Sequence, residues 1–152
     1  MAQIGQSNEV VAQATAAHID SDKQGNLHIY RFSYTHSGGA GVGTIPLRKL
    51  PAGKITIFPD LCRLITSAFA ATSDIHLGHQ AYVKRDGTTE SADDNEWLDN
   101  GDAASGIDVA WGLPAVPVTI DSRDGVMLEA MIDTGNIEDG DTIDGWCAFV
   151  KH

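Results

Sequence analysis

Four Asp-Gly pairs punctuate this chain, and they constrain its fold more than any other sequence feature. Asp-Gly adopts positive backbone φ angles at little cost and therefore suits tight hairpin turns. Short runs rich in β-branched and aromatic residues lie between turn signals, with a spacing of about 8–12 residues. This pattern predicts an all-β fold, an antiparallel β-sandwich or jelly-roll-like domain with at most one or two short helical turns. The pairs are Asp86-Gly87, Asp124-Gly125, Asp139-Gly140 and Asp144-Gly145.

Seven runs have the composition or the alternation expected of β-strands. Pro117 favours an edge position for the fifth run, and Gly78 predicts a bulge in the third. Two segments are ambiguous, because residues 61–69 fit a short helix or a buried strand and residues 95–99 fit a helical turn. The seven runs are residues 27–34, 54–58, 75–83, 107–111, 116–120, 126–132 and 145–150.

The length of 152 residues fits one domain that carries a short arm. A chain of this length can bury enough surface for a self-sufficient core, and its 42% of hydrophobic residues argues against wholesale disorder. Residues 1–9 are polar and are expected to form a loose arm, and residues 9–19 can form a first strand. The sequence therefore divides into an N-terminal arm with a possible first strand, residues 1–20, and a β-sandwich domain, residues 21–152.

The chain is acidic, with 10 basic and 21 acidic residues and a net charge of -11. Such a chain repels phosphate backbones and anionic lipids, so we expect neither a nucleic-acid nor a membrane partner. The first residues lack the basic start of a secretory signal, which predicts synthesis in the cytoplasm. The net charge is +3 over residues 1–85 and -14 over residues 86–152. This asymmetry fits either solvated acidic loops or electrostatic docking to a partner or to further copies of the chain.

The segment Asp133-Thr134-Gly135 matches the catalytic turn of aspartic proteases, in which two such aspartates share a proton. Only 17 residues follow Gly135, too few for the flap and later strands that accompany this motif. We therefore expect Asp133 to lie in a turn after a strand that ends at Ile132. No other catalytic constellation stands out, so the sequence predicts a protein that is not an enzyme and has no catalytic residues.

Three further features could be taken for ligand sites, and each has a simpler explanation. The glycine-rich residues 37–43 fit neither a phosphate-binding loop nor a dinucleotide fingerprint, so they predict a loop between strands. His76 and His79 would face opposite sides of a strand unless Gly78 bulges. Residues 86–102 hold seven acids without the order of a calcium loop, which favours a solvated acidic loop. We expect no metal site and no cofactor, while Cys62 and Cys147 could be paired or free.

Several landmarks taken together resemble small virion structural proteins of tailed bacteriophages. The resemblance covers roughly residues 25–150 and rests on turn and strand landmarks, none of them a catalytic position. The landmarks are Leu50-Pro51-Ala52-Gly53-Lys54-Ile55-Thr56-Ile57, Asp74-Ile75-His76-Leu77-Gly78-His79-Gln80-Ala81-Tyr82, Leu98-Asp99-Asn100-Gly101-Asp102-Ala103-Ala104-Ser105, Asp124-Gly125-Val126 and Gly140-Asp141-Thr142-Ile143-Asp144-Gly145.

The resemblance implies a decoration (cement) protein that clamps and stabilises the outside of an icosahedral phage capsid. Its partners would be the major capsid protein and further copies of itself, most often as a homotrimer. It would be made in the host cytoplasm and end in the virion, on the capsid exterior. The basic residues Arg48, Lys49, Lys54 and Arg63 are the expected capsid-facing charges.

Two alternative functions stay open from the sequence. One is a head–tail connector, tail or fibre-associated β domain of the virion. The other is a carbohydrate-binding β domain, in which Trp97, Trp111 and Tyr82 would stack on sugars. Aromatic residues in alternating strands are more often part of a core, which disfavours the carbohydrate alternative.

Overall fold

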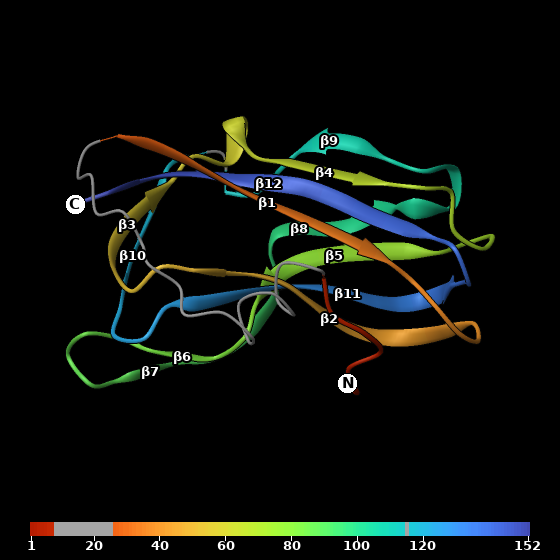
Figure 1. Ribbon diagram of the computed structural model, residues 1–152, viewed down its shortest axis with the longest axis horizontal. Helices are drawn as coiled ribbons and strands as arrows, with labels where there is room; N and C mark the ends of the chain where they lie inside the picture. The colour runs from red at the N-terminus through yellow and green to blue at the C-terminus, as the bar shows by residue number, and fades with distance from the viewer. Residues whose placement is uncertain (8–25, 115) are drawn as a thin grey trace.

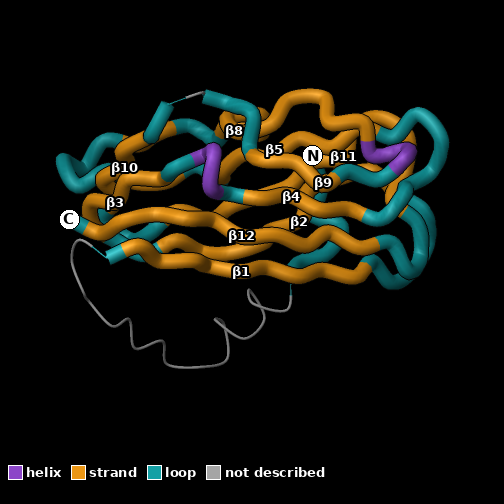
Figure 2. Tube along the Cα trace, turned by 90° about the horizontal axis from the view of Figure 1, so that it is seen from above, coloured by secondary structure: helices purple, strands orange, loops and turns teal. Residues whose placement is uncertain are grey.

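Two antiparallel sheets pack face to face, as seen in the computed structural model (Figures 1 and 2). The structure describes residues 1–7, 26–114 and 116–152. The predicted all-β sandwich is confirmed, and its only described helical elements are two short 3-10 turns, η1 (Pro59–Leu61) and η2 (Ala103–Ser105). None of the helices in the described part of the chain has the length and apolar character needed to cross a membrane.

The six-stranded sheet is built around the long C-terminal strand β12. On one side, β12 pairs with the whole of β1. On the other side, it pairs with β4 and with β3; β4 in turn pairs with β9, and β3 pairs with β10. The strand at residues 118–122 is an edge strand, as Pro117 predicted. The strands are β1 (Leu27–Thr35), β3 (Gly53–Ile57), β4 (Arg63–Thr66), β9 (Asp108–Ala110), β10 (Val118–Ser122) and β12 (Thr142–Lys151).

The second sheet has four strands in the order β2-β11-β5-β8, and a small hairpin projects at one end of the sandwich (Figure 1). Its strands are β2 (Gly41–Leu50), β5 (Asp74–His79), β8 (Asp93–Asp102) and β11 (Val126–Ile137), and the hairpin is β6 (Tyr82–Val83) with β7 (Thr89–Glu90). β8 replaces the helical turn expected at residues 95–99, and it occupies much of the predicted acidic loop. The helical prediction was wrong because Trp97 and Leu98 pack on the core from a strand paired with β5.

The first seven residues run parallel to the free edge of β2. The Ile4 N–H donates to the Thr44 carbonyl at 2.9 Å, and the Thr44 N–H donates to the Ala2 carbonyl at 3.0 Å. The Ser7 N–H donates to the Pro46 carbonyl at 2.9 Å. Residues 1–7 are therefore bound to the sheet rather than loose. The predicted first strand at residues 9–19 and the boundary at residue 20 lie outside the described residues.

Side chains from both sheets form one apolar core, through the alternation that a two-layer fold requires. In β1, Phe32 and Tyr34 point inward and are buried, while Leu27 and Ile29 point outward. Trp97 and Trp111 are buried, and their rings pack against each other in a tilted arrangement with centroids 5.4 Å apart. Their prediction as core residues is confirmed, which removes two of the three aromatics offered for sugar stacking.

Three of the four Asp-Gly pairs form the predicted turns. Gly87, Gly125 and Gly140 have φ angles of 90°, 93° and 89° between successive strands. Asp144-Gly145 instead lies inside β12, so its turn prediction was wrong. A Cβ at Gly145 would overlap the Arg63 carbonyl oxygen of β4, and this close approach of two strands explains the glycine.

Gly78 has a similar role and does not form the predicted bulge. The irregularities in the β5–β8 pairing place the extra residues on β8, while β5 pairs with β11 in unbroken register from His76 to His79. A Cβ at Gly78 would overlap the backbone of Asp93 and Asp94. The glycine therefore lets β8 cross β5 at close range.

The predicted alternatives at residues 61–69 and at the cysteines are also decided. Leu61 ends η1, and Arg63–Thr66 form β4, in which Leu64 and Thr66 are buried. This segment is therefore a strand preceded by a single turn. Cys62 and Cys147 are both free and buried. Burial and the neighbouring Cys62 sulfur raise the pKa of the Cys147 thiol well above its usual range.

Candidate functional site

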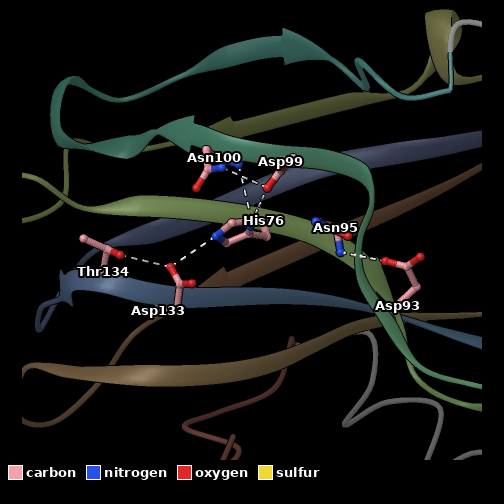
Figure 3. Close-up of polar contacts among 7 residues, drawn as sticks. All are labelled: His76, Asp93, Asn95, Asp99, Asn100, Asp133 and Thr134. Carbon is pink, nitrogen blue, oxygen red and sulfur yellow. Dashed lines mark hydrogen bonds and ion pairs between the residues drawn. The ribbon is translucent and has the colours of Figure 1, made fainter.

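A buried histidine is held between two carboxylates on the outer face of the four-stranded sheet (Figure 3). Ile75 and Leu77 of β5 point into the core, so His76 between them points outward. Its Nδ1 lies 3.1 Å from Oδ1 of Asp99 in β8, and its Nε2 lies 3.1 Å from Oδ1 of Asp133 in β11. His76 thus connects three adjacent strands through its side chain.

The imidazole has partners in more than one protonation state. The Asn100 N–H donates to Nδ1 at 3.3 Å, so a neutral ring protonated on Nε2 donates to Asp133 and accepts from Asn100. A ring protonated on both nitrogens donates to both carboxylates. Thr134 Oγ1 donates to Asp133 at 3.2 Å, and Asn100 Nδ2 donates to Asp99 at 3.0 Å. These contacts fix both carboxylates and make the cluster a polar crosslink of the sheet.

Asp133 does not lie in the predicted turn. β11 continues to Ile137 and carries extra residues relative to β2 between Ile132 and Ile137, with Gly135 at a φ of 71°. The Asp-Thr-Gly segment is therefore a bulged part of a strand. The side-chain hydrogen-bond partners of Asp133 are His76 and Thr134, whereas a protease dyad pairs such an aspartate with a second carboxylate.

We expect Asp133→Asn to keep the fold with a loss of about 1 kcal/mol in the free energy of unfolding. The amide oxygen of the variant still accepts from His76 Nε2, whereas Asp133→Ala removes the acceptor and should cost more. Urea unfolding of the two variants measures this order. Neither the parent nor Asp133→Asn should cleave a fluorogenic peptide library. If the parent has a peptidase activity that the variant lacks, the role of Asp133 is not purely structural.

His76 and His79 do not converge. His79 points toward the core, where its ring lies 5.5 Å from the Trp97 ring and its Nδ1 lies 2.9 Å from the Gln80 carbonyl oxygen. Over the part of the chain that the structure describes, no group of three or more His, Cys, Asp or Glu side chains is arranged to hold a metal ion. The expected lack of a metal and a cofactor stays a prediction.

A second acidic group surrounds a cavity of about 250 Å³ between β8, β10 and the β6–β7 hairpin. His79, Tyr82 and Trp97 line its apolar side, and Glu90, Asp93 and Glu96 supply carboxylates. Burial, followed by the negative charge of Asp93, raises the pKa of Glu96 above its ordinary value. Burial also raises the pKa of Tyr82. The ionised form of Glu96 is thus disfavoured by folding.

We expect Glu96→Gln to stabilise the protein at neutral pH. Because the pKa of Glu96 is higher in the folded state than in the unfolded state, ionised Glu96 lowers stability above the folded pKa. That penalty disappears as the pH falls through the raised pKa toward 4.5, the ordinary value, so the advantage of the variant should disappear there too. Thermal unfolding between pH 4 and 8 measures the difference. The exposed Glu138→Gln is the matched control, and an equal gain in both variants would contradict this explanation.

The four basic residues predicted to face a capsid do not share one surface. Arg48 lies in the seam between the sheets, with its guanidinium 4.7 Å from the centroid of the Tyr30 ring and an Nε that is buried. Lys49 follows it on β2 and points to the other side of the strand. Lys54 and Arg63 belong to the other sheet, where Arg63 is paired with Asp108 at 2.6 Å. The four residues are close in the sequence, but strand alternation and their membership of different sheets place them on different surfaces.

The His76 crosslink was not predicted from the sequence. Asp133 was singled out for a protease motif, and Asp99 only as one acid in a cluster. The sequence signal that could have indicated this site is His76 itself. It lies between the apolar residues Ile75 and Leu77, so strand alternation directs its side chain to the outer face.

Comparisons with known proteins identify the fold. No family model matches the chain, and no curated protein sequence matches it. A chain in the capsid of Ralstonia phage GP4 is 20% identical with a TM-score of 0.68, over 99% of both chains. A chain in the capsid of cyanophage Pam1 is 11% identical with a TM-score of 0.55, over 93% of this chain and 96% of that one.

A more distant likeness involves the VP2 protein of infectious bursal disease virus. It is 16% identical with a TM-score of 0.51, over 90% of this chain but only 36% of that protein. At these identities the likeness establishes a shared β-sandwich fold. In the two phage structures the similarity covers nearly the whole of both chains.

Proposed function

We propose that this chain is a non-enzymatic structural protein of a bacteriophage virion. Within the virion, it decorates the outside of the capsid as a cement protein and stabilises the shell. The observation that carries this proposal is the match over 99% of both chains to a chain in the capsid of Ralstonia phage GP4. Similarity over nearly the whole of both chains supports a role for this domain as a structural unit of a capsid.

The physical properties of the domain suit this task. A shell component needs a rigid unit that resists unfolding and proteolysis, and here short turns join strands around one continuous core. The polar cluster at His76 adds crosslinks between three strands. These features stabilise a surface for docking without requiring a reactive group.

The charge favours the exterior of the capsid over the interior. A chain with a net charge of -11 is repelled by the phosphate backbones of packaged nucleic acid. On the outer surface of a particle, the same charge keeps particles dispersed through mutual repulsion. Self-association as a trimer would match a local three-fold axis of the shell, since closed cyclic assemblies are the usual form of such oligomers.

The test uses purified chain and shells of its phage prepared without it. We expect saturable, stoichiometric binding, a raised temperature of shell disruption, and density on the outer capsid surface by electron microscopy. Sedimentation analysis should give three times the chain mass. Density at the tail or connector would favour the other virion role, and no binding to any part of the particle would refute the proposal.

A further inference from the structure

The outer face of the six-stranded sheet carries exposed apolar side chains. Leu27 and Ile29 of β1 and Leu61 of η1 are each 54% exposed. Leu27 is the register partner of Val150 in β12, and Ile29 is the partner of Ala148. Leu27, Ile29 and the partly exposed Val150 therefore form an apolar strip on the outer face, whereas Ala148 beside Ile29 is buried. A cluster of exposed apolar side chains can mark a binding surface.

An arginine–tryptophan–arginine row crosses three strands beside this strip. Arg31, Trp146 and Arg63 are register partners on β1, β12 and β4. The Trp146 Nε1–H donates to the Leu61 carbonyl at 2.8 Å, which fixes the indole on the surface. Tryptophan and arginine are the residue types most enriched among residues that dominate binding energy at protein interfaces.

The two guanidinium groups of this face differ in their carboxylate partners. Among the residues that the structure describes, no carboxylate lies within ion-pair distance of the exposed Arg31 guanidinium. Arg63 has one carboxylate partner, Asp108, whose side chain is 61% exposed. The face thus offers apolar area beside the guanidinium groups of Arg31 and Arg63, and it also carries the carboxylates of Asp108 and Asp144. The apolar area and the Arg31 charge complement a surface that presents a carboxylate beside an apolar centre.

The outer face of the four-stranded sheet has the opposite character. Carboxylates crowd it, several of them on the adjacent strands β5, β8 and β11, and they alternate with inward-pointing core residues. Such a face repels an acidic partner and favours water. Its carboxylates are Asp74, Asp99, Asp102, Glu129 and Asp133.

We propose that the outer face of β1, β12 and β4, defined by Leu27, Ile29, Arg31, Leu61, Arg63 and Trp146, is the surface that docks on the capsid shell. This inference rests on the proposed function. Its partner is a shell subunit that presents an apolar patch flanked by carboxylates, one of which pairs with Arg31. The acidic face of the four-stranded sheet then points away from the particle.

The test compares matched variants on the two sheets for binding to shells prepared without this chain. Ile29→Asp places a charge in the apolar strip, and its control is Val42→Asp in β2, where the valine is 41% exposed. Arg31→Glu reverses the open charge, and its control is Lys49→Glu on β2. Leu61→Asp, in a turn rather than a strand, is a second apolar-to-charged variant on the same face if Ile29→Asp fails to fold.

We expect Ile29→Asp and Leu61→Asp to raise the dissociation constant about tenfold or more, because a carboxylate would be buried against the apolar patch. Arg31→Glu should slow association, most at low salt. Val42→Asp and Lys49→Glu should bind like the parent. If the parent binds shells and only the β2 variants Val42→Asp and Lys49→Glu weaken this binding, the proposed docking face is wrong while the proposed function stands. A parent that binds no shell would overturn both.

Discussion

Gly78→Ala is expected to lower the free energy of unfolding by about 3 kcal/mol, the upper end of the usual cost of overpacking in a core. The added Cβ would overlap the backbone of Asp93 and Asp94 at the start of β8. Backbone atoms held in a sheet cannot move aside as the end of a flexible side chain can. The variant must therefore displace β8 from β5, and with it the buried Trp97.

Gly41→Ala is the matched control for this substitution. Gly41 also lies in a strand, β2, but a Cβ there would meet no heavy atom within 4 Å. Its replacement by alanine should leave the urea unfolding midpoint nearly unchanged or slightly raised, since alanine restricts the unfolded chain. Equal unfolding midpoints for the two variants would show that β8 does not cross β5 as closely as the structure describes.

The sequence predicted those strands whose identity depends on local pattern. Residues 27–34 are rich in aromatic and β-branched residues and residues 54–58 alternate, and the structure has the strands β1 and β3 at Leu27–Thr35 and Gly53–Ile57. The turns at Gly87, Gly125 and Gly140 were likewise predictable, because a positive φ angle is a local requirement.

The errors fall where contacts distant in sequence decide the local structure. Gly145 is explained by the carbonyl of Arg63, 82 positions earlier in the chain, and no local pattern reveals that approach. β8 contains polar and acidic residues and bulges against β5, so its sequence lacks the alternation of a regular strand. Tertiary pairing overrides local propensity at such positions.

The same reasoning separates the predictable and unpredictable parts of the candidate sites. That His76 and His79 point to opposite sides follows from strand alternation. The meeting of His76 with Asp99 and Asp133 requires the order of three strands in a sheet. The arginine–tryptophan–arginine row likewise depends on the register of β1, β12 and β4, and its members are 32 to 115 positions apart in the sequence.

Trp97→Ala is expected to lower the free energy of unfolding by about 3–5 kcal/mol, the range for removing a large aromatic side chain from a core. Trp97 is fully buried, and its ring packs at a tilt against the rings of Trp111 and His79, with centroid distances of 5.4 Å and 5.5 Å. Truncation leaves a cavity between the two sheets, and the rigid rings of Trp111 and His79 that line it cannot collapse to fill it.

Trp97→Phe tests which part of the side chain provides this stability. Among the described residues, the buried Nε1 of Trp97 has no hydrogen-bond partner, so phenylalanine loses ring volume but no hydrogen bond. Its loss of stability should be clearly smaller than that of Trp97→Ala. Trp146→Ala is the comparison for a partly exposed tryptophan, with an expected loss of about 1–2 kcal/mol from one hydrogen bond and partial burial. If chemical unfolding shows a larger loss of stability for Trp146→Ala than for Trp97→Ala, the packing of Trp97 between the sheets would not be a main source of the stability of the domain.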